Sequence, residues 1–146
     1  MKLKKWLLAL AAFAVMAVVC AIAAGAETYG DFEYHVNYDG IAKITKYTGD
    51  AKNIEIPAEI NGKSVTSIGS YAFRGCTSLT NITIPDSVTD IYGRAFERCT
   101  NLTDITIPSS VTHIGSGVFS GCTSLTEIEV ATDNSSYASL NGVLYD

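Results

Sequence analysis

Three cysteines recur at a fixed interval, and their thiols could take part in more kinds of chemistry than any other side chain of this sequence. After residue 26, Cys76, Cys99 and Cys122 stand 23 residues apart. Thiols can form disulfides, hold soft metals or pack as small apolar side chains. Three is an odd number, and side chains at one repeat position stack in the same direction, so they are poorly aimed at each other. We therefore predict free thiols buried in the core.

Other groups with catalytic or metal-binding chemistry are sparse. The sequence has two histidines, His35 and His113, so a metal site would lack ligands beyond one cysteine per repeat. It contains neither a phosphate-binding loop nor a nucleophile-elbow pattern. Asp90 and Asp104 could act as paired carboxylates, but acidic residues are expected on any solvated face. We predict no enzyme activity, no cofactor and no metal site.

The cysteines belong to a repeat that runs from residue 65 to residue 133. The segment Val-Thr-x-Ile begins at residues 65, 88 and 111. A phenylalanine column and a leucine column keep the same spacing: Phe73, Phe96 and Phe119, and Leu79, Leu102 and Leu125. An interval of 23 residues falls in the range of leucine-rich solenoids. We therefore predict three stacked repeats over residues 65–133.

Within one repeat the pattern predicts a short strand, a second extended segment and one helical turn. Ile82 and Ile84 share the inward face of the strand, and Pro85 ends it because proline has no N–H for the ladder. Phe96 and Cys99 are three residues apart, which favours a helical turn if both point inward.

Glycine alternates with large residues in two columns of the repeat. Gly69, Tyr92 and Gly115 share one position, and Gly75, Arg98 and Gly121 share another. A position that needs a positive φ would strongly resist Tyr or Arg. We therefore interpret these glycines as permitted by the fold and not required.

Residues 27–64 precede the regular repeats. An alternating run ends at an Asp39-Gly40 turn, which predicts a β-hairpin that we interpret as the N-terminal cap. Asn53-Ile54-Glu55-Ile56-Pro57 anticipates the repeat strand and is followed by an insertion at 58–64, so we predict a first irregular rung. Residues 134–146 predict a C-terminal turn and strand, with a truncated further repeat as the alternative.

The N-terminus has the layout of a secretory signal peptide. Three lysines precede an apolar run over residues 6–24, and Ala24-Gly25-Ala26 offers the small residues of a cleavage site. We predict a signal peptide at residues 1–26 cleaved after Ala26, with an uncleaved membrane anchor as the alternative. The remaining chain carries 7 Lys and Arg against 15 Asp and Glu, a net charge of −8. This charge disfavours nucleic acid and anionic membranes as partners, and the predicted location is secreted or cell-surface.

The run from Ile68 to Thr89 carries a specific pattern, Ile-x4-Phe-x2-Cys-Thr-x-Leu-Thr-x-Ile-x-Ile-Pro-x2-Val-Thr. This pattern resembles the BspA-type leucine-rich repeat, as do the upstream hairpin and the closing segment 137–145. The resemblance implies a repeat solenoid: a right-handed leucine-rich-repeat β/α solenoid with stacked short parallel strands and one helical turn per repeat. It also implies a secreted or surface protein of a kind often implicated in adhesion, and it brings no family-wide catalytic residues.

The outward strand positions form the first candidate binding site. They stack into two columns: Asn53, Asn81, Asp104 and Glu127, beside Glu55, Thr83, Thr106 and Glu129. Such ladders form recognition surfaces in repeat proteins. The alternative, that they are simply the polar side of a sheet, remains open. The columns contain no aromatic residue, which favours a basic or polar protein surface over a sugar as the partner.

A second candidate patch lies near the predicted helical edge. It comprises Tyr71, Arg74, Tyr92, Arg94 and Arg98. Tyr and Arg often anchor protein interfaces. Ordinary surface decoration is the competing interpretation of this patch.

The sequence as a whole predicts a small exported binding module that adheres to an extracellular or surface protein. The alternative is a structural spacer, or the N-terminal fragment of a larger secreted protein whose effector domain lies beyond Asp146.

Overall fold

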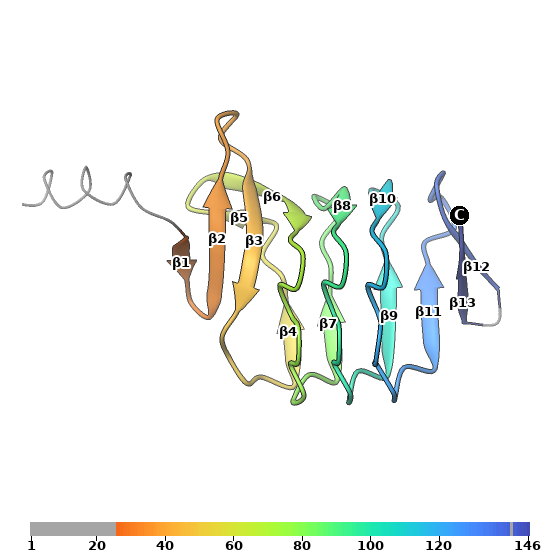
Figure 1. Cartoon of the computed structure of the whole chain (residues 1–146). Coiled ribbons are helices and arrows are strands. Elements are labelled where there is room, and N and C mark those ends of the chain that lie inside the picture. Colours follow the sequence, from red (N-terminus) through yellow and green to blue (C-terminus); the bar gives the residue numbers. More distant parts are fainter. Residues whose placement is uncertain (1–25, 141) are drawn as a thin grey trace, which may run out of the picture.

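The computed structural model describes residues 26–140 and 142–146. The backbone winds into a β-solenoid whose successive rungs lie side by side (Figure 1). Residues 1–25, which hold nearly all of the predicted signal peptide, lie outside the described residues. Within the described part of the chain, no helix is long and apolar enough to cross a membrane.

One face of the solenoid is formed by short parallel strands, one from each rung. These strands are β4 (Asn53–Glu55), β7 (Asn81–Thr83), β9 (Asp104–Ile107) and β11 (Glu127–Val130). β4 pairs with β7, and β9 pairs with β11, both in parallel. The Thr103 N–H donates to the Thr80 carbonyl at 3.3 Å and so links the second pair to the first. The prediction of stacked short parallel strands is confirmed.

The second sheet combines the N-terminal segment with the second extended segment of each repeat. Its strands are β1 (Glu27–Tyr29), β2 (Phe32–Val36), β3 (Ala42–Tyr47), β5 (Glu59–Ile60), β6 (Lys63–Ile68), β8 (Asp90–Ile91) and β10 (His113–Ile114). The order is β1-β2-β3-β6-β8-β10, with β5 paired to β6. The pairs from β1 to β3 are antiparallel and those from β3 to β10 are parallel, so the hairpin leads directly into the solenoid.

Local residues explain two of the hairpin turns in the N-terminal part. Asn37 Oδ1 accepts the N–H groups of Asp39 and Ile41 at 3.1 and 2.9 Å between β2 and β3. Between β5 and β6, Asn61 and Gly62 have φ angles of 49° and 74°. Two consecutive positive φ angles match the tight turn that joins twisted antiparallel strands.

Aromatic side chains stack through the core from the hairpin to the last rung. The Phe73 and Phe96 rings lie 5.2 Å apart, and the Phe96 and Phe119 rings lie 5.9 Å apart. Tyr47 extends the stack at 5.6 Å from Phe73. Each ring is therefore covered by its neighbour, which is why the rungs must stack in order to bury their apolar faces.

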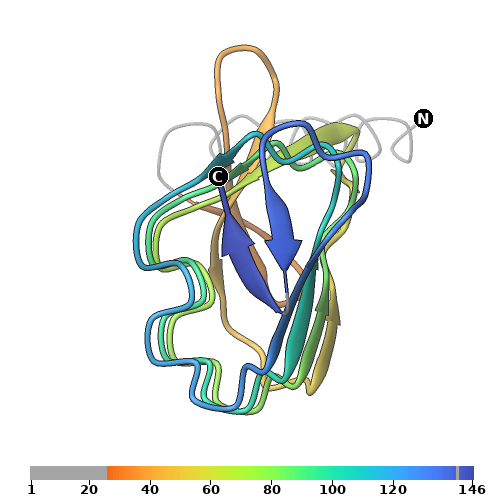
Figure 2. The same ribbon diagram turned by 90° about the vertical axis from the view of Figure 1, so that its right-hand side faces the viewer.

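The segment around Phe96 differs from the predicted helical turn. Strands and turns, but no helix, make up the described residues. The Phe96 N–H donates to the Val118 carbonyl of the next rung at 3.0 Å, while the Cys99 N–H donates back to the Phe96 carbonyl at 3.2 Å. The Glu97 N–H likewise donates to the Arg94 carbonyl at 3.1 Å, so the segment is a series of tight turns tied to the next rung and not an α-helix. Figure 2 shows the resulting turns as a stepped edge, stacked rung upon rung.

The two glycine columns are constrained more strongly than predicted. Gly75, Arg98 and Gly121 have φ angles of 70°, 61° and 74°, so this position does require the left-handed conformation and Arg98 adopts it. A Cβ added at Gly115 would overlap the Gly93 backbone, with the Gly93 Cα only 2.8 Å away. The interpretation that glycine is not required holds for the second column, because Arg98 adopts the left-handed conformation there. It is wrong for Gly115, where the neighbouring rung leaves no space for a side chain.

Residues 134–146 place an antiparallel hairpin against the last rung. Its strands are β12 (Ala138–Leu140) and β13 (Val143–Tyr145). The Ile128 N–H donates to the Gly142 carbonyl at 3.2 Å, and the Ile114 N–H donates to Tyr137 Oη at 2.8 Å. These hydrogen bonds pair N–H groups on the exposed edges of β11 and β10. Without them, these N–H groups could pair with a strand of another molecule.

Candidate functional site

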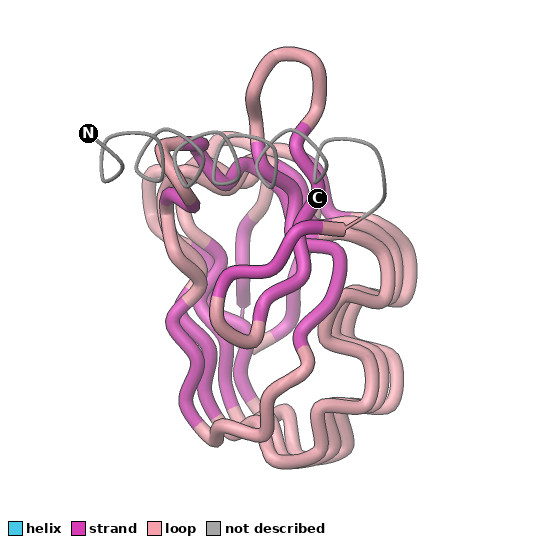
Figure 3. The backbone as a smooth tube through the Cα atoms, turned by 90° about the vertical axis from the view of Figure 1, so that its left-hand side faces the viewer, coloured by secondary structure: helices cyan, strands magenta, loops and turns pink. Residues whose placement is uncertain are grey.

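The eight predicted ladder residues lie together on the outer face of the strands β4, β7, β9 and β11. All eight are exposed, whereas the isoleucines between them point into the core. The parallel register places Asn53 beside Asn81 and Glu127 beside Asp104. We call this set the polar ladder: Asn53, Glu55, Asn81, Thr83, Asp104, Thr106, Glu127 and Glu129. Figure 3 shows the strands that carry it on one side of the solenoid and the turns on the other.

The polar ladder becomes more acidic toward its C-terminal end. The column that starts with two asparagines continues with Asp104 and Glu127, which are direct cross-strand partners. No Lys or Arg follows Arg98 in the sequence. Like charges opposite each other on neighbouring strands are destabilising. The acidic end of the polar ladder is therefore not what stability alone would select.

Two of the grooves that open on the polar ladder lie toward its C-terminal end. The smaller, about 330 Å³, is lined mainly by β7 and β9 and includes Asp86 and Asp104. The larger, about 640 Å³, lies between β11 and the C-terminal hairpin and is lined by Thr106, Glu127, Glu129, Ser139 and Gly142, among others. Concave surfaces of this size can receive side chains of a partner.

Hydroxyl groups hold two of the ladder carboxylates in place. Thr103 Oγ1 donates to Asp104 Oδ2 at 2.8 Å, and Thr106 Oγ1 donates to Glu129 Oε2 at 3.4 Å. An ionised carboxylate can accept several hydrogen bonds, so each retains capacity for an external donor.

The structure separates Tyr92 from the other members of the second predicted set. Lys43 Nζ lies 4.3 Å from the centre of the Tyr92 ring, and the His113 ring meets it edge-on at 6.0 Å. Lys43 and His113 both belong to the second sheet, so Tyr92 packs against side chains of that sheet. The other four side chains are exposed on the turns, and we call them the turn patch: Tyr71, Arg74, Arg94 and Arg98.

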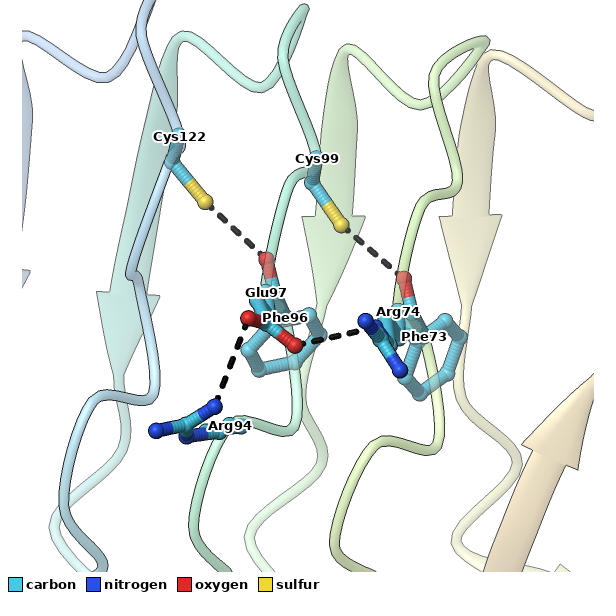
Figure 4. Close-up of polar contacts among 7 residues, drawn as sticks. All are labelled: Phe73, Arg74, Arg94, Phe96, Glu97, Cys99 and Cys122. Atoms are coloured by element: carbon cyan, nitrogen blue, oxygen red, sulfur yellow. Dashed lines mark hydrogen bonds and ion pairs between the residues drawn. The ribbon is translucent and has the colours of Figure 1, made fainter.

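A nearly buried acid, absent from the predicted sites, organises the turn patch. Glu97 is 7% exposed and lies between two arginines (Figure 4). Arg74 Nε is 2.9 Å from Glu97 Oε2, and Arg94 Nη1 is 3.6 Å from Glu97 Oε1. The spacing of three residues between Arg94 and Glu97 was the available signal, because it is compatible with an ion pair on one side of a turn.

The three cysteines are free thiols, and the middle one is the most deeply buried. Cys99 Sγ donates to the Phe73 carbonyl at 3.1 Å, and Cys122 Sγ donates to the Phe96 carbonyl at 3.0 Å (Figure 4). The neighbouring Cys122 and Cys76 thiols, together with burial, raise the pKa of Cys99. The neighbouring Cys99 thiol lowers the pKa of Cys122 to about 7 and also lowers the pKa of Cys76. The predicted burial holds in full for Cys99, while the two end thiols are half-buried and more acidic.

Metal-ligating residues are dispersed over the described chain. Within residues 26–140 and 142–146, no group of three or more His, Cys, Asp and Glu side chains is arranged to hold a metal ion.

Solved structures with a similar fold include bacterial leucine-rich repeat proteins. One from Bacteroides ovatus is 33% identical, with a TM-score of 0.63, and the match covers 70% of this chain and 28% of that one. One from Bacteroides capillosus is 24% identical, with a TM-score of 0.55, and the match covers 74% and 99%. The pneumococcal vaccine antigen PcpA is 18% identical, with a TM-score of 0.52 and coverage of 83% and 53%. No curated protein matches the sequence.

The fold and its repeat define the class of protein, a leucine-rich-repeat β-solenoid. The family model described as the BspA type leucine-rich repeat region matches residues 43–140 with six copies. The chain belongs to the BspA-type leucine-rich repeat family, so the resemblance stated from the sequence is confirmed. Leucine-rich repeats are typically binding scaffolds without enzyme activity, and their partners are commonly proteins.

Proposed function

We propose that this chain is a secreted or cell-surface binding module that adheres to a protein partner through the polar ladder. The observation that carries the proposal is the continuous row of exposed polar side chains with two grooves opening on it. Outward positions of a solenoid sheet contribute little to the core, so their residue types can vary to suit a partner.

The chemistry of the polar ladder favours a partner with a basic surface. Asp104, Glu127 and Glu129 concentrate negative charge near the larger groove. Complementary charge steers association and selects among partners. The same charge disfavours nucleic acid, and the lack of aromatic residues in the ladder leaves a sugar ring without a stacking platform.

Export is part of the proposal and is supported by the sequence of residues 1–26. Cleavage after Ala26 would leave β1, which starts at Glu27, as the first element of the mature chain. The β2–β3 hairpin would then cap the first rung. An uncleaved segment would display the same polar ladder at a membrane.

A structural spacer is the second candidate function. The chain spans 28% of the length of the Bacteroides ovatus protein that it matches, so these rungs resemble part of a longer solenoid. In a spacer the rungs would set the distance between other domains. The charges of the polar ladder would then be dispensable, and this difference separates the two candidates.

The test compares two charge-reversed variants of the purified protein. The ladder variant carries Asp104→Lys and Glu127→Lys, which changes the charge but keeps like charges opposite each other. The control variant carries Glu59→Lys and Asp146→Lys, which are exposed acids outside the polar ladder. Each protein is immobilised, extracellular proteins are passed over it, and the retained proteins are identified by mass spectrometry.

A binding module predicts a protein that the wild type and the control variant retain and the ladder variant loses. Thermal melting of the ladder variant should match that of the wild type, so that the loss reports on the surface. Identical retention by all three proteins would contradict the polar ladder as the site. A wild type that retains nothing would favour the spacer.

A further inference from the structure

The three arginines of the chain all belong to the turn patch. Arg74, Arg94 and Arg98 are the only arginines in the sequence. The Arg74 and Arg94 side chains are 51% and 55% exposed, and Tyr71 beside them is 46% exposed. Glu97 is their acidic partner, so this set keeps a net positive charge on a chain that is otherwise acidic.

The contacts of Glu97 hold two of these guanidinium groups in place. Arg74 approaches Glu97 through Nε, which leaves its two terminal nitrogens free of that contact. Arg94 approaches Glu97 through Nη1 (Figure 4). The Arg74 guanidinium also lies 5.4 Å from the centre of the Tyr71 ring. Side chains that are already ordered lose less entropy on binding a ligand. The turn patch is therefore organised before any partner arrives.

Backbone strain distinguishes the turn patch from ordinary surface. Tyr71 and Arg94 have φ angles of 62° and 58°, and Gly117 occupies the same position in the next rung with 64°. Arg98 has a φ of 61° in the column that otherwise holds glycine. Glycine adopts this conformation without steric cost, whereas Tyr and Arg do not. Strained residues concentrate at functional sites, so the fold alone does not account for Tyr and Arg here.

We infer that the turn patch is a second docking surface, which binds an acidic segment of a partner protein. The planar guanidinium group matches a carboxylate with two parallel hydrogen bonds, and Tyr and Arg are the residues that most often dominate interface energetics. A sulfated glycan or nucleic acid fits less well, because residues 27–146 carry a net charge of −8 and repel an extended polyanion. The turn patch is distinct from the polar ladder, because the turn patch would bind an acidic segment and the polar ladder a basic surface.

The test uses a variant that removes charge and strain together. Arg94→Gly with Arg98→Gly removes two cations, leaves the closer Arg74–Glu97 pair intact and should not lower the melting temperature. The control is Lys52→Ala with Lys63→Ala, which removes two exposed cations elsewhere. The probe is a short fluorescein-labelled peptide rich in Asp and Glu, and its binding to each protein is followed by fluorescence anisotropy.

We expect the turn-patch variant to bind this peptide about tenfold more weakly than the wild type, with the control nearly unchanged. The wild-type affinity should also fall as salt rises. Absence of binding to the wild type, equal losses in the two variants or no loss in either would overturn the proposal. A heparin fragment that binds the wild type more tightly than the peptide would assign the patch to glycans instead. A polar-ladder variant, Asp104→Asn, should still bind the peptide, which keeps this test independent of the proposed function.

Discussion

The polar ladder and the turn patch lie on the same rungs but differ in backbone conformation and in charge. The ladder residues occupy extended strands, where any outward side chain is sterically acceptable. Three of the four turn-patch residues occupy left-handed positions, where glycine fits best. The ladder becomes acidic toward its C-terminal end, whereas the patch contains every arginine of the chain.

Because of this difference, a residue type in the turn patch is stronger evidence of function than one in the polar ladder. An acidic residue on an extended strand is weak evidence of function, because solvated strands commonly carry charge. An arginine in a left-handed turn is stronger evidence, because the backbone resists it by about 1 kcal/mol or more. A non-glycine residue in an unfavourable backbone conformation therefore needs a functional explanation more than a residue on an extended strand.

The largest expected effect comes from the aromatic stack that supports both surfaces. Phe96→Ala should destabilise the protein by about 3–5 kcal/mol, because the side chain is fully buried between two other rings. Chemical denaturation would measure this loss. Phe119→Ala is the matched control at the half-buried end of the stack and should cost clearly less. Equal losses would show that the stack does not depend on neighbours on both sides.

The second effect tests whether the turn patch depends on its buried acid. Glu97→Ala should destabilise by about 1–2 kcal/mol, since it leaves Arg74 and Arg94 without their counter-ion. The loss stays moderate because both arginines are half-exposed and regain water. Melting curves with Glu33→Ala as control, an acid in the more exposed Lys46 pair, would measure the difference. If the Glu97 variant is as stable as that control, Glu97 does not organise the turn patch.

The sequence supports prediction of the strands far better than prediction of the turns. Strand residues such as Ile82 and Ile84 alternate with polar ones, and this period determines which side chains face outward. The eight ladder positions could therefore be deduced before the structure. Specificity within the ladder could not be deduced, because the outward position accepts many residue types.

The turns could not be predicted well because their conformation arises between rungs. The Phe96 N–H bonds to the next rung, and tight turns stand where Phe96 and Cys99 suggested a helical turn. The left-handed conformation of Arg98 is likewise imposed by stacking, against the preference of the residue. The burial of Glu97 depends on arginines from two rungs, a contact that is not visible in one repeat.

A smaller effect of opposite sign tests the strain in the turn patch. Arg98→Gly should stabilise the protein by about 0.5–1 kcal/mol, because glycine adopts a φ of 61° without a steric penalty. Lys52→Gly is the matched control, since Lys52 is an exposed cation outside the left-handed positions and outside the ion pairs, and it should destabilise. Both are read from thermal melts. If the two substitutions shift stability in the same direction, the strain argument fails.

The smallest effect tests the acidic end of the polar ladder. Asp104→Asn should stabilise by about 0.2–0.5 kcal/mol at low salt, because it removes a like charge opposite Glu127 on β11. The gain should shrink as salt is added, since salt screens exposed charges. Asn81→Asp is the reciprocal control, because it adds an acid next to Asp104 and should destabilise by a similar amount. A salt-independent response would mean that packing, rather than charge, distinguishes the acidic rungs from the amide rungs.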